Sequence, residues 1–159
     1  MDAATPGPVT LDAFPAAVAA LLVTEDGHYL LQRRDEKPDI WFPGYCSLFG
    51  GLIEEGESPE EALARELSEE LDYQPGAFSY FTQVCFDLRR WNRGIKLRYI
   101  YEVPVKRAEI SGMSLREGQA IELHGPQAVM GIDRLAPYDA VAIGLHMADR
   151  LLQRAPLLL

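Results

Sequence analysis

Three glutamates in this 159-residue chain are spaced so that one helix could present them together to a metal ion. Glu66, Glu69 and Glu70 occupy positions i, i+3 and i+4, which places them on one side of a helix within about one turn. Two such charges about 4 Å apart repel by roughly 4 kcal/mol at an effective dielectric of about 20, and Arg65 alone cannot neutralise them. Divalent cations would neutralise these charges. Oxygen ligands favour Mg²⁺, with Mn²⁺ as a substitute. Because Mg²⁺ also binds phosphate oxygens, the pattern indicates phosphoryl transfer.

The helix that must carry these glutamates has a clear start signal. Ser58-Pro59-Glu60-Glu61 supplies a capping hydroxyl, a proline at the first helical position and a carboxylate at the third. The sequence therefore predicts a helix over 59–72. Its buried stripe would consist of Ala62, Leu63, Leu67 and Leu71.

A solvated acidic face is the alternative interpretation of any helix that carries several glutamates. The residues just before this helix favour a ligand site, because Phe49-Gly50-Gly51 and Gly56 give the backbone freedom to approach a ligand closely. Glycine-rich loops are weak evidence by themselves. Together with the capped acidic helix they indicate a binding loop.

The segment from Gly51 to Tyr73 resembles the Nudix box. That pattern is glycine, five residues, glutamate, seven residues, Arg-Glu, an aliphatic residue, any residue, Glu-Glu, any residue, glycine and an aliphatic residue. Asp72 and Tyr73 depart from its last two positions, and aspartate can adopt the left-handed conformation at a helix end. The residues that match are Gly51, Glu57, Arg65, Glu66, Leu67, Glu69 and Glu70.

The resemblance implies an α+β fold, the Nudix α/β/α sandwich with a mixed β-sheet between helices. It also implies that Arg65 and Glu57 form a buried pair that orients the ligand carboxylates. Arg116-Glu117-Gly118-Gln119 resembles the Glu-Gly-Gln loop of bacterial 8-oxo-dGTP diphosphatases, so Glu117 is a further candidate ligand, with an exposed loop acid as the alternative. The implied metal ligands are Glu66, Glu69, Glu70, Glu117 and the Gly50 carbonyl.

By the same resemblance, the reaction is hydrolysis of a phosphoanhydride bond. The substrate class is a nucleoside diphosphate linked to another moiety, as in nucleoside triphosphates, ADP-ribose or nucleotide sugars. Either Glu70 or Glu117 would take the water proton. Two rival functions stay open: a non-catalytic, nucleotide-sensing module of the same fold, and isopentenyl diphosphate isomerisation, for which Cys46 lies in a suitable region. The candidate catalytic residues are Glu57, Arg65, Glu69, Glu70 and Glu117.

The residues before the box offer candidates for substrate binding. Arg33 could meet phosphates, and Trp41 and Phe42 could stack on a base. Tyr45 and Phe49 are expected to pack in the core. The basic residues of 89–98 could contact substrate or the partner subunit of a homodimer, or could simply be solvated. The three histidines show no metal-ligand spacing, and the sequence assigns them no role.

The remaining elements follow from turn signals and periodicity. An Asp-Gly turn joins two strands in a first hairpin, a proline-bounded loop covers 35–44, and an Asn-Gly turn joins a second hairpin. We expect a sheet with one helix on each side. The chain divides into a loosely ordered arm, 1–14, and one domain, 15–159. The predicted strands are 18–24, 29–33, 45–49, 78–88, 95–105 and 120–124, and the closing helix is 138–154.

The composition narrows the possible partners. With 48% hydrophobic and 25% charged residues the chain suits a globular domain, and its net charge of −9 argues against nucleic acid polymers as partners. We expect no membrane segment, no secretion signal and a cytoplasmic location. Two cysteines are too few for a disulfide framework. The apolar end, 156–159, could be sheltered in a homodimer.

Overall fold

The computed structural model describes residues 14–154. The arm predicted at 1–14 and the apolar end at 156–159 lie outside this range, apart from residue 14. No helix within 14–154 is long and apolar enough to cross a membrane. The elements are β1 (Ala16–Thr24), β2 (Tyr29–Arg33), β3 (Cys46–Ser47), α1 (Pro59–Leu71), β4 (Ser79–Asp87), η2 (Arg89–Trp91), β5 (Ile95–Val105), α2 (Arg107–Ile110), β6 (Ala120–His124), η3 (Val129–Gly131) and α3 (Pro137–Arg154).

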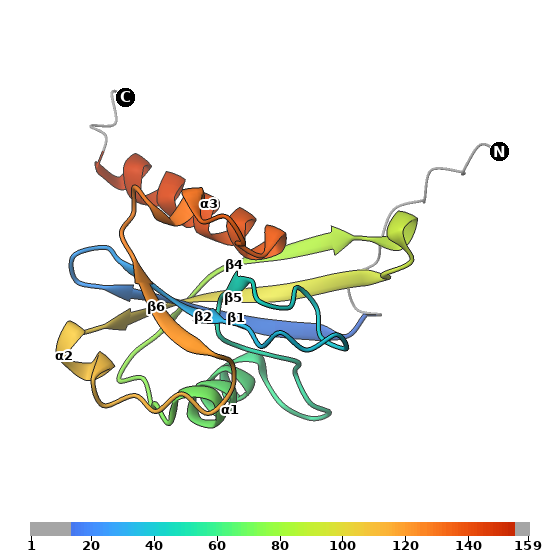
Figure 1. Ribbon diagram of the computed structural model, residues 1–159, viewed down its shortest axis with the longest axis horizontal. Coiled ribbons are helices and arrows are strands. Elements are labelled where there is room, and N and C mark those ends of the chain that lie inside the picture. Colours follow the sequence, from blue (N-terminus) through green and yellow to red (C-terminus); the bar gives the residue numbers. More distant parts are fainter. Residues whose placement is uncertain (1–13, 155–159) are drawn as a thin grey trace.

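A mixed sheet forms the centre of the molecule. Its strand order is β3-β2-β1-β5-β4, and β6 pairs with β2. β1 and β5 run parallel, whereas the other strand pairs are antiparallel. Helix α1 lies on one side of the sheet and α3 on the other (Figure 1). The α/β/α sandwich expected from the sequence is therefore confirmed.

The two faces of β1 supply two hydrophobic cores. Val18, Ala20 and Leu22 pack in the core that includes the predicted stripe of α1, all four members of which are completely buried. The alternate β1 residues belong to the second core, which includes Ala142 and Ile143 of α3. Full burial of a leucine or valine contributes about 1.5–3 kcal/mol, so both helices are held firmly on the sheet.

One edge of β1 pairs with two different segments along its length. Its first half pairs with the glycine-rich segment and so fixes the position of that segment. β2 pairs with only Leu22 and Val23. Further back along β1, Val18 N donates to Gly51 O at 2.8 Å and Ala20 N donates to Phe49 O at 2.9 Å. The strand predicted over 45–49 is thus wrong in extent, because the chain pairs with β2 only at Cys46–Ser47 and then crosses to β1.

The other predicted strands and helices are present, with bounds shifted by at most two residues. β4 and β5 form the expected antiparallel hairpin, but its connection contains η2 rather than a simple turn. Asn92 and Gly94 both adopt left-handed backbone there, which explains the turn signal in the sequence. Helix α2 lies in a segment for which the sequence predicted no element.

Candidate active site

The ends of α1 fix the positions of its glutamates. The Ser58 hydroxyl accepts the Glu61 N–H at 3.2 Å, and the Glu61 carboxylate accepts the Ser58 N–H at 2.9 Å, which completes the predicted capping box. At the other end Asp72 is left-handed, with φ 54°, and its N–H bonds to the carbonyls of Leu67 and Ser68. Asp72 thus forms the helix end for which a glycine is usual. The capping keeps Glu66 and Glu70 one turn apart, facing the glycine-rich segment.

Glu70 is the most enclosed of the box glutamates, with 5% of its surface exposed. Its Oε2 accepts the Gly50 N–H at 2.8 Å, and its Oε1 accepts a hydrogen bond from Gln32 Nε2 at 3.3 Å. Burial, followed by the nearby charges of Glu66 and Glu117, raises the pKa of Glu70 to about 8. Neutral donors hold the carboxylate in place, and no cationic side chain within residues 14–154 forms an ion pair with it.

Glu66 lies directly against Gly51. A Cβ at residue 51 would come within 2.6 Å of the Glu66 carboxylate carbon, so only glycine leaves this carboxylate its position. Arg65 Nη1 donates to Glu66 Oε1 at 2.8 Å. Burial nevertheless raises the Glu66 pKa above its usual value, and the charges of Glu69 and Glu117 act in the same direction.

Arg65 ties the loop to the helix. Its Nε and Nη2 donate to the two oxygens of Glu57 at 2.8 and 3.0 Å, and Nη2 also donates to Leu52 O at 2.9 Å. Glu57 in turn accepts the Glu54 N–H at 3.0 Å. Such a two-bond pair is rigid, and Arg65 also bonds the Glu66 carboxylate. The two side chains are 23% and 14% exposed, so the pair is half-buried rather than buried as the resemblance implied.

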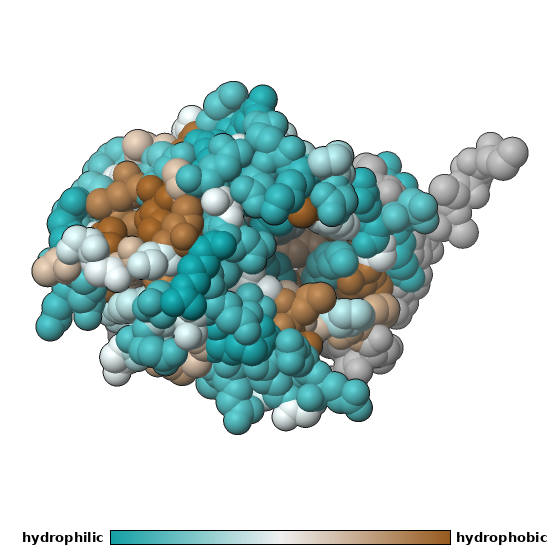
Figure 2. Space-filling view, turned by 60° about the horizontal axis from the view of Figure 1, so that its bottom comes forward, coloured by the Kyte–Doolittle hydropathy of each residue, from teal (hydrophilic) through white to brown (hydrophobic). Residues whose placement is uncertain are grey.

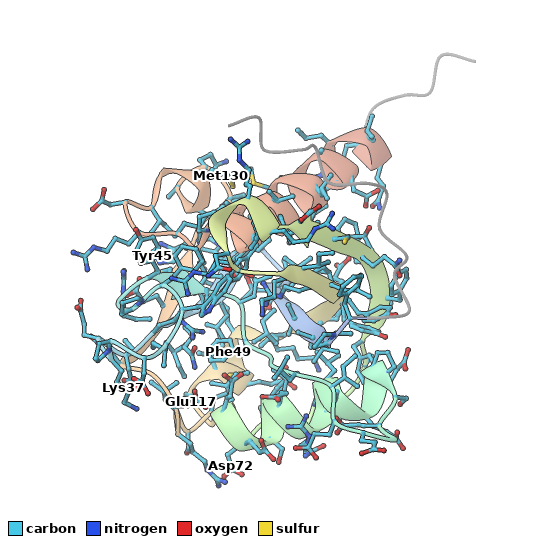
Figure 3. All side chains as sticks on the ribbon, turned by 90° about the vertical axis from the view of Figure 1, so that its right-hand side faces the viewer. Lys37, Tyr45, Phe49, Asp72, Glu117 and Met130 are labelled. Atoms are coloured by element: carbon cyan, nitrogen blue, oxygen red, sulfur yellow. The ribbon has the colours of Figure 1, made fainter. Side chains whose placement is uncertain are left out.

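Glu69 and Glu117 are placed differently from Glu66 and Glu70. The Glu69 side chain is 61% exposed and contacts Arg65 Nη1 at 3.3 Å, at the rim of the site. Glu117 is also exposed, but its loop is anchored, because its carbonyl accepts Gln32 Nε2 at 3.0 Å and Arg116 N donates to Glu70 O at 2.8 Å. Figure 3 shows Glu117 near the end of α1 that carries Asp72.

The donor set at this place suits a hard divalent cation. It consists of carboxylate oxygens beside a segment of glycine backbone, and burial, as the largest cause, raises the pKa of both Glu66 and Glu70. Mg²⁺ and Mn²⁺ prefer such oxygen ligands. The face of the molecule turned forward in Figure 2 is mainly hydrophilic, with hydrophobic side chains gathered in one patch and around a hollow.

A pocket of about 400 Å³ adjoins Gly50 and Gly51. The Trp41 ring lies 5.1 Å from the Arg93 guanidinium and 5.0 Å from Lys96 Nζ. The basic hairpin therefore reaches the pocket, which combines an aromatic face with positive charge in an acidic protein. Such a lining suits an anionic ligand that carries a ring. Side chains that line the pocket include Arg34, Trp41, Lys96, Arg98, Tyr138 and Asp139.

Two predicted substrate residues lie outside that lining. Arg33 instead holds both oxygens of Glu122, at 2.8 and 3.0 Å, and Phe42 packs against the rings of its neighbours. Arg34 lines the pocket in place of Arg33, because successive residues of an extended chain point to opposite sides. The sequence predicts Arg33 in this role, whereas the strand register places Arg34 at the pocket instead.

Sequence reasoning also missed polar groups that line the pocket from distant elements. Asp139 is completely buried, pairs with Arg98 and accepts the Leu48 N–H at 3.3 Å. The buried Ser47 hydroxyl has no hydrogen-bond partner within residues 14–154. No sequence pattern around either residue predicts its burial, because each is buried only when the sheet packs against α3.

Cys46, the residue considered for isomerisation, lies elsewhere. It belongs to the core on the α3 side, and its thiol donates to Glu122 Oε2 at 3.3 Å. The α1 glutamates lie on the opposite side of the sheet. The arrangement therefore offers no cysteine beside Glu66 and Glu70.

Comparisons with known proteins agree with this geometry. A family model described as the NUDIX domain matches residues 13–143. The nucleoside triphosphatase NudI of Salmonella agona is 47% identical over 53 residues, which are 33% of this chain and only 37% of that relative. The solution structure of the Escherichia coli ORF135 protein has a TM-score of 0.71 and 26% identity, covering 94% of this chain and all of that one. The crystal structure of a MutT protein from Methanosarcina mazei Go1 has a TM-score of 0.68 and 25% identity, covering 88% and 96%.

Proposed function

Because the chain belongs to the NUDIX family, whose domain model spans residues 13–143, we propose that it is a metal-dependent pyrophosphohydrolase. It would cleave a phosphoanhydride bond in a nucleoside diphosphate linked to another moiety. One observation carries the proposal: Glu66 and Glu70 meet the Gly50–Gly51 backbone, where Arg65 holds Glu66 and the Gly50 N–H and Gln32 hold Glu70. A divalent cation would stabilise the ionised form of carboxylates confined in this way, and a diphosphate could share it.

We assign the metal site to the carboxylates of the box, the Glu117 loop and the Gly50 carbonyl. A bound Mg²⁺, or Mn²⁺ in its place, supplies positive charge for the diphosphate oxygens and makes water easier to deprotonate. Arg65 keeps Glu57 and Glu66 in position throughout, since its hydrogen bonds do not depend on substrate. The proposed ligands are Glu66, Glu69, Glu70, Glu117 and Gly50 O.

The proton acceptor is Glu70 or Glu117. Water oxygen attacks phosphorus in line, the bridging P–O bond breaks, and the water proton passes to the carboxylate. Glu70 is fixed by Gly50 N and Gln32, whereas the Glu117 carboxylate is exposed on its anchored loop. Each placement suits a different role, and replacing each glutamate by glutamine separates them.

The pocket supports a nucleotide as substrate. Trp41 offers a face for a base, and the cations around it offer charge for phosphates. We propose nucleoside triphosphates as the first class to test, because a relative with 47% identity over 53 residues is described as a nucleoside triphosphatase. ADP-ribose and nucleotide sugars share the diphosphate and complete the panel.

The test is hydrolysis of that panel by the purified chain with Mg²⁺ or Mn²⁺, followed by product analysis. We expect release of a nucleoside monophosphate, and a loss of about 10²- to 10⁴-fold in kcat for Glu70→Gln. Glu55→Gln, at an exposed glutamate outside the proposed ligand set, is the matched control and should keep the wild-type rate. Tight nucleotide binding without turnover under either metal would instead identify a nucleotide sensor.

A further inference from the structure

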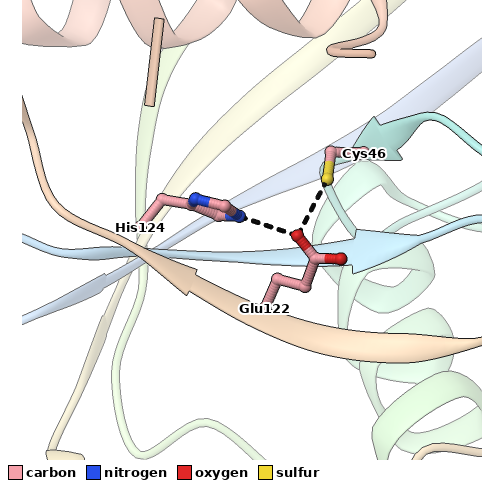
Figure 4. A group of neighbouring side chains, drawn as sticks. All are labelled: Cys46, Glu122 and His124. Carbon is pink, nitrogen blue, oxygen red and sulfur yellow. Dashed lines mark hydrogen bonds and ion pairs between the residues drawn. The ribbon is translucent and has the colours of Figure 1, made fainter. Parts of the chain in front are cut away.

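A second group of metal-binding side chains lies away from α1. Cys46 comes from β3, and Glu122 and His124 come from β6, so the group spans the two strands that flank β2 (Figure 4). One ligand atom from each residue lies within 4.8 Å of the other two. Glu122 Oε2 stands between them, 3.3 Å from Cys46 Sγ and 2.9 Å from His124 Nε2.

The strand register explains why residues so far apart in sequence meet. Glu122 and His124 are two positions apart on β6 and therefore share a face of the sheet. Cys46 pairs with Arg33 of β2, and the Arg33 guanidinium reaches Glu122 on that same face. Cys46 belongs to the core beneath α3. This group is therefore separated by the sheet from the carboxylates of α1.

The hydrogen bonds within the group suit the later arrival of a cation. The thiol of Cys46 and the ring nitrogen of His124 are directed at the same oxygen of Glu122, so one ion at their meeting point can take the place of two hydrogens. Arg33 donates to both oxygens of Glu122, from Nε to Oε1 at 2.8 Å and from Nη2 to Oε2 at 3.0 Å. It therefore fixes the carboxylate, as partners of metal ligands commonly do.

The group is accessible from one side only. The side chains of Glu122 and His124 are 27% and 23% exposed, whereas Cys46 is completely buried. An ion can therefore enter past the carboxylate and the imidazole and meet the sulfur last. Sulfur, nitrogen and oxygen together select a borderline-soft ion rather than Mg²⁺.

We propose that Cys46, Glu122 and His124 bind one Zn²⁺ ion. The ligands are the thiolate sulfur, the Nε2 of a neutral imidazole and a carboxylate oxygen, and water takes the fourth position. Binding releases the thiol proton to solvent. The hydrogen that His124 Nε2 shares with Glu122 leaves that nitrogen, so the neutral ring that binds the ion carries its single hydrogen on Nδ1. The ion links β3 to β6 across β2 and so raises the thermal unfolding midpoint of the whole domain.

Cobalt is the most direct probe of this site, because Co²⁺ bound by a thiolate gains a sulfur-to-metal charge-transfer band. The reduced full chain is titrated with Co²⁺ and then with Zn²⁺, in excess Mg²⁺ so that oxygen-only sites are filled. We expect one equivalent of Co²⁺ to produce the band and one equivalent of Zn²⁺ to remove it. Zn²⁺ should also raise the unfolding midpoint.

Variants identify the ligands. Cys46→Ser and His124→Ala should each weaken Zn²⁺ binding by more than about 100-fold, beyond the 10- to 100-fold that changes around a metal site usually cause. Cys85→Ser, at the exposed cysteine, should bind as the wild type does. Absence of the charge-transfer band in the wild-type chain overturns the proposal even if the variants fail to fold. Undiminished Zn²⁺ binding by folded Cys46→Ser overturns it as well.

Discussion

Gly51→Ala tests whether the position of one carboxylate controls the reaction. The added Cβ would lie 2.6 Å from the Glu66 carboxylate carbon and 2.8 Å from Oε2, whereas ordinary contact begins at 3.4 Å. Oε1 would lie closer still, so the carboxylate must retreat by about 1 Å. A misplacement of about 1 Å can lower a rate about 100-fold. We expect kcat to fall about 100-fold, because Arg65 can no longer hold the Glu66 carboxylate at the proposed metal site.

The same substitution should leave the fold intact. The contact falls on the far end of a side chain, and Gly51 does not adopt left-handed backbone, so alanine is compatible with this conformation. The free energy of unfolding should change by less than about 1 kcal/mol.

The assay is steady-state hydrolysis of the best nucleotide at saturating Mg²⁺, with urea unfolding on the same preparations. Gly76→Ala is the matched control, since nothing lies within 4 Å of its Cβ position and its backbone also lies outside the left-handed region. It should keep the wild-type kcat. A folded Gly51→Ala protein with undiminished kcat would refute the assignment of Glu66 to the metal site.

Three further changes test the pocket and the core. Trp41→Ala should raise KM for nucleotides about 10-fold or more, with little change in kcat, because stacking on a base contributes about 1–3 kcal/mol; an unchanged KM would exclude stacking there. Asp139→Ala leaves the Arg98 guanidinium without its buried partner and should lower the free energy of unfolding by about 3–5 kcal/mol in urea denaturation, whereas a neutral effect would show that water replaces the pair. Burial holds the pKa of His146 below its ordinary 6.5, so the unfolded chain gains a proton first and stability is lost as pH falls below about 6.5. Relative to His146→Gln, the wild type should lose up to about 1.4 kcal/mol between pH 7.5 and about 5.5, and parallel pH curves for the two proteins would contradict this.

Local signals made α1 predictable. Its capping residues, its apolar stripe and the spacing of its glutamates all act within a few residues, so they have the same meaning in the sequence as in the fold. The pairing of Arg65 with Glu57 was expected only from the resemblance to the Nudix box. The Nudix box therefore predicted both helix α1 and the glutamate that lies against Gly51.

Features that depend on the register of distant strands could not be predicted. Arg33 and Arg34 have the same charge, and only the pairing of β2 decides which reaches the pocket. His124 was assigned no role, because its neighbours Cys46 and Glu122 come together only across β2. The two-residue length of β3 has the same origin, since the chain leaves β2 to complete the edge of β1.

The parallel pairing of β1 with β5 also limits when the chain can fold during its synthesis. Their paired residues are about 80 positions apart, so a growing polypeptide must reach Val105 before its first strand finds this neighbour. The acidic helix leaves the ribosome well before that point and has no finished sheet on which to pack. A nascent chain stopped ahead of β5 should therefore contain every box glutamate and still bind no nucleotide.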